Sequence, residues 1–199
     1  MNISVIKNLQ WVDYFIYSLT DPRMLYKLIA NKSPESFRLS FAVPVLVCFC
    51  DVIALTVLSG DFWASFISYA IVLSIMLSLF MNLIFTGIID FLSQMMGHAG
   101  NAKSTFVLIN FSFLPKAFIL PIALIFSISG FAPVFFYFLF SAIFLVWAAI
   151  NVICGISEMR SISGGKATLI YFSPTIICMS VLFFTMLIFV TGVLKSLGI

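Results

Sequence analysis

The sequence predicts an all-α polytopic membrane protein, with five transmembrane helices preceded by amphipathic interfacial helices. Of its 199 residues, 63% are hydrophobic and only 9% are charged, and the mean hydropathy is +1.22. A soluble domain carries roughly a quarter charged residues to keep its surface wet. The apolar residues also form long runs of the roughly 20 residues that a helix needs to cross a bilayer. Such runs, without the short alternation of a barrel strand, favour helices.

The apolar runs divide the chain into two parts. Residues 1–38 form a cytoplasmic amphipathic N-terminal region, and residues 39–199 form the transmembrane domain. We predict five membrane spans within this domain, at about residues 40–58, 62–89, 105–127, 133–153 and 169–193.

The positions of the basic residues predict the orientation. Eight Lys and Arg residues lie before the first span or in the connections after the second and fourth spans, whereas only Lys195 lies on the opposite side. Cytoplasmic segments carry an excess of Lys and Arg. We therefore expect the N-terminus in the cytoplasm and the C-terminus outside.

The N-terminal region has the pattern of two short helices. Asp21-Pro22 separates them, because Asp suits a helix cap and Pro suits the first helical turn. The region carries acidic residues and no small-residue cleavage site, so we do not expect a signal peptide. One interpretation is a pair of helices lying on the inner leaflet, and the alternative is packing against the cytoplasmic ends of the spans. An apolar stripe at helical spacing comprises Val5, Leu9, Val12, Ile16 and Leu19.

Two charged residues fall inside predicted spans. Asp51 lies just beyond the middle of the first span, and Lys116 lies at the centre of the third. Both spans run outward, so at about 1.5 Å per residue the two differ in depth by only about 3 Å. A lone charge there costs at least about 2.5 kcal/mol, so we predict an intramembrane ion pair. It is either a structural lock between helices or an ion-responsive site on a transport path. We expect Asp90, the rival partner, at the cytoplasmic headgroups.

Three asparagines predict a polar layer in the inner leaflet. Asn82, Asn110 and Asn151 each lie about 10 Å to the cytoplasmic side of the centre of their span. An amide that faced lipid unpaired would cost several kcal/mol, so we expect these side chains to bond across helices. The alternative is that some of them bond the backbone of their own helix.

The residues that enzymes and metal sites need are scarce. His98 is the single histidine, and there is no His-Glu-x-x-His sequence. Gly164-Gly165-Lys166 lacks the first glycine and the hydroxyl of a phosphate loop, so a turn before the fifth helix is expected. Cys48, Cys50, Cys154 and Cys178 suit helix packing. We therefore predict no enzymatic activity, no cofactor, no metal and no nucleic-acid partner.

A few punctuating residues resemble a known family. The chain has Asp21-Pro22 in a basic N-terminal region, Phe91 to Gly100 at the end of a long second span, and Phe111 to Pro115 early in the third. Gly155 to Arg160, followed by Gly164-Gly165-Lys166-Ala167, lies between the last two spans. This arrangement resembles the Yip family of five-span, Ypt/Rab-interacting membrane proteins, over about residues 22–194.

The resemblance implies a membrane protein without known chemistry. Eukaryotic members bind Rab-type GTPases, and they carry Asp-Leu-Tyr-Gly-Pro and Tyr-Gly-Tyr-like motifs that are missing here, so no GTPase-binding residue can be transferred to this chain. The chain therefore resembles a prokaryotic branch, in a plasma membrane. Our first hypothesis is a non-catalytic, membrane-organising protein or accessory subunit, whose partners are the phospholipid bilayer and other membrane proteins or a second copy. The alternative is a small transporter, channel or lipid-translocating protein that uses Asp51 and Lys116.

Overall fold

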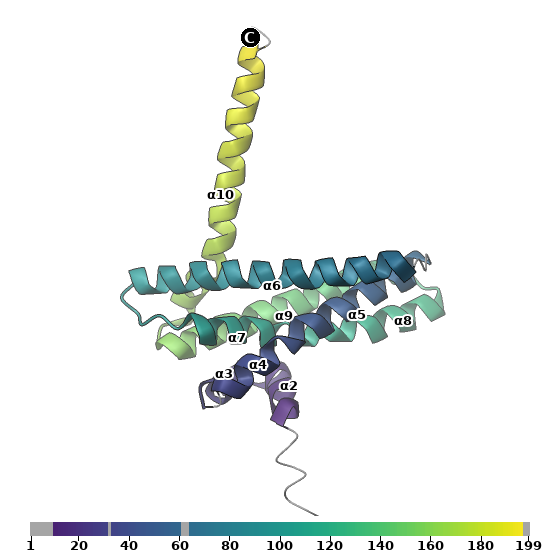
Figure 1. Cartoon of the computed structure of the whole chain (residues 1–199), viewed down its shortest axis with the longest axis horizontal. Helices are drawn as coiled ribbons and strands as arrows, with labels where there is room; N and C mark the ends of the chain where they lie inside the picture. The colour runs from purple at the N-terminus through teal and green to yellow at the C-terminus, as the bar shows by residue number, and fades with distance from the viewer. Residues whose placement is uncertain (1–9, 32, 61–63, 197–199) are drawn as a thin grey trace, which may run out of the picture.

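The computed structural model describes residues 10–31, 33–60 and 64–196, and these ranges form helices and short connections, with no strand (Figure 1). Five segments are long and apolar enough to cross a membrane, which confirms the predicted fold class. They begin and end within seven residues of the predicted limits, and the second and fourth extend six and seven residues further than predicted. Their bounds are Glu35–Ser59, Phe66–Met95, Ala102–Ser129, Pro133–Arg160 and Gly164–Gly192.

Short helices precede the first long one. They are α2 (Gln10–Thr20), α3 (Pro22–Asn31) and α4 (Ser33–Ser40). The carboxylate of Asp21 accepts hydrogen bonds from the backbone N–H groups of Arg23 and Met24, at 3.0 and 3.2 Å. Asp21 therefore caps α3, and Pro22 begins it, as the sequence predicts.

These short helices pack against the sides of the longer ones. Leu25 and Ile29 of α3 are buried, and the ring of Tyr14 stacks on that of Phe111 at 4.6 Å. Burial raises the pKa of Tyr14, so its ring stays neutral in this contact. Ile16, in the predicted stripe, is 46% exposed. The contacts favour the packing alternative over a pair of free interfacial helices. Val5 and Leu9 lie outside the described residues.

The long helices form a bundle with two distinct ends. α5 (Ala42–Ser59) and α8 (Ile119–Ser129) finish at Gly60 and Gly130, whose φ angles of 75° and 68° favour glycine. We name this the Gly60 end. α6 (Ala64–Met95) and α9 (Pro133–Arg160) finish at the opposite end, which we name the Met95 end. The basic residues predict that the Met95 end is cytoplasmic.

The third span is broken in its middle. α7 (Ala102–Ser112) gives way to the 3-10 helix η1 (Leu114–Phe118), and α8 follows. Pro115 has no N–H to donate, so a regular α-helical bond is lost at this point. The N–H of Lys116 instead bonds the carbonyl of Phe113 at 2.9 Å. The break turns the Lys116 side chain toward α5.

The apolar core has two parts. The larger fills the Met95 half of the bundle and includes Leu108, Val152 and Ile156. The smaller lies toward the Gly60 end, around Ala54, Ile119 and Ala123. Gly155 allows α9 to approach α7, because a Cβ there would collide with the side chain of Leu108. Residues 104 to 112 of α7 are all buried, because α6, α9, α3 and α4 together surround the inner half of the third span.

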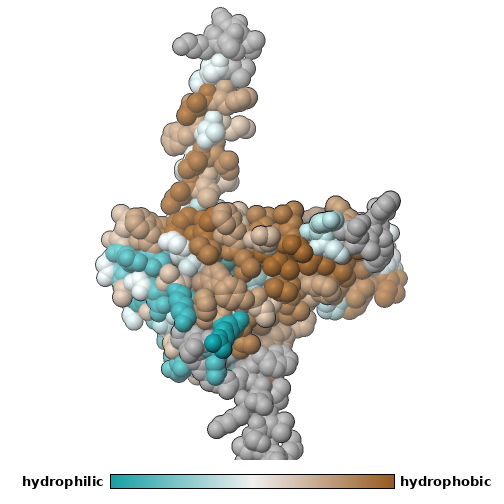
Figure 2. All heavy atoms as spheres, in the orientation of Figure 1, coloured by the Kyte–Doolittle hydropathy of each residue, from teal (hydrophilic) through white to brown (hydrophobic). Residues whose placement is uncertain are grey.

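The last helix leaves the bundle. α10 (Gly164–Ser196) contacts α9 and α6 at its base, where Ala167, Ile170 and Pro174 are buried, and then stands away from the bundle (Figure 1). Every residue from 175 to 192 is exposed. Figure 2 shows hydrophobic residues along α6 and α10, while hydrophilic ones gather at the Met95 end and around the short helices.

Candidate functional site

The two charges inside the spans lie together. The ammonium nitrogen of Lys116, on η1, is 2.8 Å from Oδ2 of Asp51, on α5. The two side chains are 22% and 24% exposed, so the pair is largely withdrawn from the surface. The break at Pro115 therefore sets the position of Lys116 opposite Asp51.

A tyrosine completes this cluster. The hydroxyl of Tyr137, on α9, donates a hydrogen bond of 2.7 Å to Oδ1 of Asp51. Tyr137 is buried, and a buried tyrosine hydroxyl normally finds a hydrogen-bond partner. Asp51 thus joins three helical segments, and each carboxylate oxygen has a donor. Sequence reasoning missed Tyr137, because depth alone does not show which way an aromatic residue points.

The charged cluster borders a cavity between α5 and α6. Asp51, Lys116 and Asn82 line it together with Ser74 and Ser78, and its volume is about 270 Å³. A second cavity of about 770 Å³ shares Ser74 and extends past Thr56 to Ser59 near the Gly60 end. Toward the Met95 end, the side chains of Asn82 and Asn110 and the larger core follow. The space beside the charged cluster therefore extends toward the Gly60 end.

Each of the three asparagines takes part in a hydrogen bond to another helix, but the three do not all bond one another. Asn82 donates to the side-chain oxygen of Asn110 at 2.8 Å, which joins α6 to α7. Asn151 instead donates to the backbone carbonyl of Ser18 at 2.7 Å. Asn110 and Asn151 are both fully buried. The structure thus brings two of the three side chains together, and the third holds α2 against α9.

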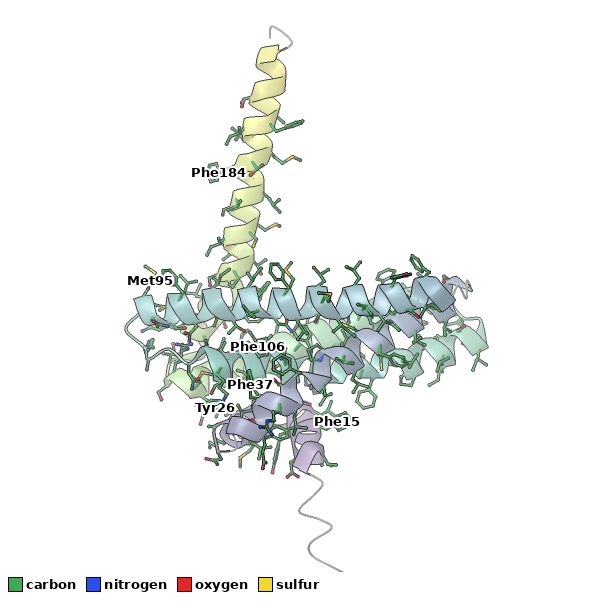
Figure 3. All side chains as sticks on the ribbon, in the orientation of Figure 1. Phe15, Tyr26, Phe37, Met95, Phe106 and Phe184 are labelled. Carbon is green, nitrogen blue, oxygen red and sulfur yellow. The ribbon has the colours of Figure 1, made fainter. Side chains whose placement is uncertain are left out.

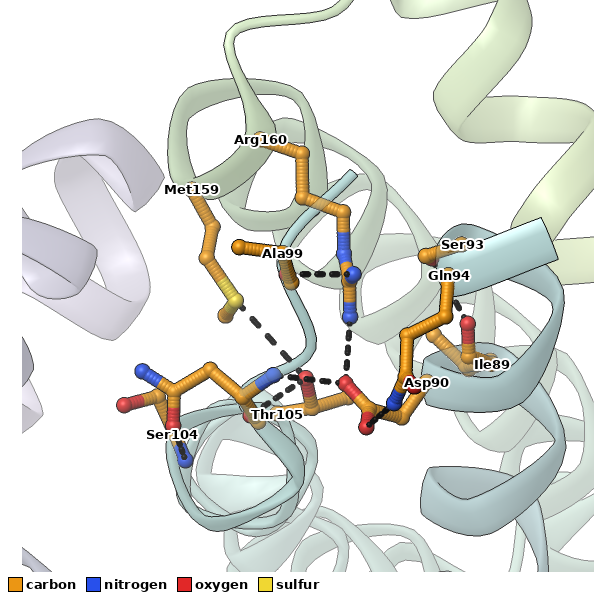
Figure 4. Close-up of polar contacts among 10 residues, drawn as sticks. Ile89, Asp90, Ser93, Gln94, Ala99, Ser104, Thr105, Met159 and Arg160 are labelled. Atoms are coloured by element: carbon orange, nitrogen blue, oxygen red, sulfur yellow. Dashed lines mark hydrogen bonds and ion pairs between the residues drawn. The ribbon is translucent and has the colours of Figure 1, made fainter. Parts of the chain in front are cut away.

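A second charged cluster lies at the Met95 end (Figure 4). Nη2 of Arg160 is 2.8 Å from Oδ1 of Asp90, and Nη1 donates to the carbonyl of Ala99. The backbone N–H of Asn101 and the side chain of Gln94 also donate to Asp90, at 2.7 and 2.8 Å. The Arg160 side chain is only 1% exposed, and that of Asp90 only 10%. Asp90 is therefore a buried carboxylate with three partners, Arg160, Asn101 and Gln94, near the end of α6.

The two clusters differ in what they can do. The Asp90–Arg160 cluster is closed on all sides and fixes the loop 96–101, so it suits a structural role. In the other cluster, Asp51 and Lys116 line a cavity, so an ion or a polar ligand in that cavity would contact their charged groups. In the described ranges no group of three or more His, Cys, Asp or Glu side chains has the arrangement of a metal site.

Comparison with known proteins identifies the family. A family model described as the Yip1 domain matches residues 16–186. Comparison with curated proteins and with solved structures gives no match. The matched region includes all the residues of both charged clusters and most of α10, and it confirms the resemblance found in the sequence. The chain therefore belongs to the Yip1 domain family of membrane proteins.

Proposed function

We propose that this protein is a non-catalytic accessory subunit that binds other membrane proteins, or a second copy of itself, through α10. The observation that carries the proposal is the exposure of α10 from 175 to 192. The other membrane-spanning helices contact one another over much of their length, whereas α10 contacts its own chain only at its base. Such a helix presents a long apolar surface to a partner within the bilayer.

One face of α10 has the composition of a helix–helix contact. Cys178, Thr185 and Gly192 recur every seven residues, so they lie on one side of the helix. Small residues let transmembrane helices approach closely, and close packing drives their association because apolar surface gains nothing over lipid. This stripe is the proposed contact face. Leu187 lies on the opposite face and provides a control position.

The test compares what the two faces bind. The full-length protein is extracted from native membranes in polymer-bounded discs, and associated proteins are identified by mass spectrometry. Thr185→Phe adds bulk to the small-residue face and is expected to remove a partner or the second copy. Leu187→Phe is expected to leave the set of associated proteins unchanged. If both variants and the unchanged protein are extracted with the same associated proteins, the proposal is contradicted.

The proposed setting is a prokaryotic plasma membrane, with the N-terminus in the cytoplasm. The orientation is supported by the eight-to-one distribution of basic residues, and the prokaryotic setting by the missing eukaryotic motifs. In this orientation the Met95 end and the helices α2 to α4 face the cytoplasm. The space beside Asp51 then extends toward the outer side of the membrane.

A second candidate function is transport of a small ion or polar solute past Asp51 and Lys116. The two cavities that share Ser74 favour it, because they form a space with some polar lining residues from the charged cluster toward the Gly60 end. The Asn82–Asn110 bond and the packed core beyond it favour the accessory role, because they leave that space closed at the Met95 end. Transport would require the Asn82–Asn110 bond to break and the packed core beyond it to separate.

Substitution of the ion pair separates these functions. Asp51→Asn combined with Lys116→Gln removes both charges and keeps side chains of similar size that can still hydrogen bond. Under the accessory role, the double variant is expected to fold and to keep its partners. Under the transport role, it is expected to fold but to lose solute flux in liposomes. Flux equal to that of the unchanged protein would exclude a transport path through the pair.

A further inference from the structure

A third cavity, with apolar walls, lies on the other side of α6 and is separate from the charged cluster. Its volume is about 360 Å³, and it lies between α6, the start of α7 and the α4–α5 junction. Phe37, Phe41 and Phe106 form one wall, with ring centroids 5.2 to 6.2 Å apart. Figure 3 shows Phe37 and Phe106 facing each other beside α6. This groove has almost entirely hydrocarbon walls.

The groove runs along the direction of the membrane normal. Its α6 wall extends from Leu79 to Gly87, which is roughly 12 Å at the rise of an α-helix. Gly87 lies eight residues before the last residue of α6, so it is about 12 Å from the Met95 end. Leu79 lies near the middle of the predicted bilayer. The groove therefore follows the path of an acyl chain in the inner leaflet.

A cation lies at the end of the groove nearest the Met95 end. Lys103, in the first turn of α7, lines the groove, and its ammonium nitrogen is 5.1 Å from the centroid of the Phe37 ring. The residue is exposed, so a phosphate can also reach the ammonium group. Arg38, which follows Phe37 on α4, is exposed at the same level. A lysine with an apolar stem and a charged tip at the interface suits an anionic headgroup.

We propose that this groove binds one anionic phospholipid, whose acyl chain lies between Phe41, Phe106 and Leu83 and whose phosphate is bound by Lys103. The hydrocarbon walls, their direction and the lysine that lines the headgroup end together select this occupant. A neutral phospholipid would fill the groove but would lack a negative net charge for the lysine. The site is independent of the role proposed for α10.

Gly87 provides a variant that fills the groove. A Cβ at this position would meet no atom within 4 Å, so a larger side chain points into open space. Leucine also suits a helix better than glycine, so Gly87→Leu is expected to fold. Ala142→Leu is its control, because Ala142 is an exposed small residue on α9 that does not line the groove. Lys166→Gln is the control for Lys103→Gln, since Lys166 is an exposed lysine at the same end of the molecule.

The experiment measures lipid binding to the full-length protein by native mass spectrometry in detergent. Phosphatidylglycerol and phosphatidylcholine with identical acyl chains are titrated separately. The unchanged protein is expected to bind phosphatidylglycerol several-fold more tightly than phosphatidylcholine. Lys103→Gln should reduce binding of phosphatidylglycerol to that of phosphatidylcholine, and Gly87→Leu should weaken binding of both lipids. Ala142→Leu and Lys166→Gln should change neither.

Three results would overturn the proposal. The first is equal binding of the two lipids to the unchanged protein. The second is an equal effect of Lys103→Gln and Lys166→Gln, which would indicate unspecific attraction to positive charge. The third is retention of phosphatidylglycerol by Gly87→Leu, which would place the lipid outside the groove. Elution of each variant as a single species in gel filtration verifies that it is folded.

Discussion

At the scale of single residues, the molecule contains two charge pairs in very different surroundings. Asp51 and Lys116 lie beside a cavity, and each is about a quarter exposed. Asp90 and Arg160 are almost completely enclosed, with Asn101 and Gln94 as further donors. A buried charge is tolerated only when its partners are present. Loss of a partner should therefore be most costly at Asp90.

Arg160→Ala is expected to destabilise the protein by about 3–5 kcal/mol, because it leaves the Asp90 carboxylate buried without its cation. The measurement is thermal or denaturant unfolding of the purified protein, followed by tryptophan fluorescence. The double variant Asp90→Asn/Arg160→Gln should recover much of this loss, since it removes the isolated charge and keeps polar groups in both positions. Equal destabilisation by the single and double variants would show that the charge is not responsible.

Counting depth along the spans accounts for some of these residues and not for others. Asp51 and Lys116 share a depth because both spans run in the same direction, and the structure has them in contact. The same count, applied to the ends of the second and fourth spans, would have paired Asp90 with Arg160. Tyr137 could not be found in this way, because its partner depends on rotation about the helix axis. The sequence pattern carries no such information for a helix that is apolar on nearly every side.

At the scale of whole elements, the N-terminal helices act as part of the bundle. α3 packs on α9 and α7, and α2 is held by the Tyr14–Phe111 stack and by the bond from Asn151 to Ser18. Asn151 has the depth predicted for a polar layer. The Asn151 side chain bonds α2, because the backbone carbonyl of Ser18 lies within hydrogen-bond distance of its amide group. The sequence predicted short helices at these positions, but not that they would bury the inner half of the third span.

Tyr14→Ala is expected to loosen α2 from the bundle. Tyr14 is 1% exposed and stacks on Phe111, so its removal leaves a cavity that costs about 3–5 kcal/mol by analogy with buried phenylalanine. Limited proteolysis should cleave the N-terminal region of this variant much faster than that of the unchanged protein. Tyr14→Phe keeps the ring and is the control. Similar cleavage of Tyr14→Ala and Tyr14→Phe would contradict a packing role for the ring.

At the scale of the whole molecule, the direction of α10 relates the fold to the membrane. α5, α6 and α9 lie alongside one another, whereas α10 extends across their direction (Figure 1). Its apolar segment, Gly164–Gly192, is 29 residues long. A helix that is apolar on all sides has no polar face to rest in the headgroup region. We therefore expect α10 to cross the bilayer in the cell, by turning at the short connection after Arg160.

Cysteine labelling tests this topology in intact cells. The native cysteines at positions 48, 50, 154 and 178 are first replaced by alanine. Single cysteines are then introduced at Ser129 near the Gly60 end, at Ser163 before α10 and at Thr191 near the end of α10. A membrane-impermeant maleimide should label the cysteines at 129 and 191 directly, and the one at 163 only after permeabilisation. This pattern follows if the basic residues hold the Met95 end in the cytoplasm and α10 carries the chain back across the bilayer.

If the cysteines at 163 and 191 label only after permeabilisation, then α10 does not span the membrane. Its apolar surface would in that case be covered by protein on the cytoplasmic side.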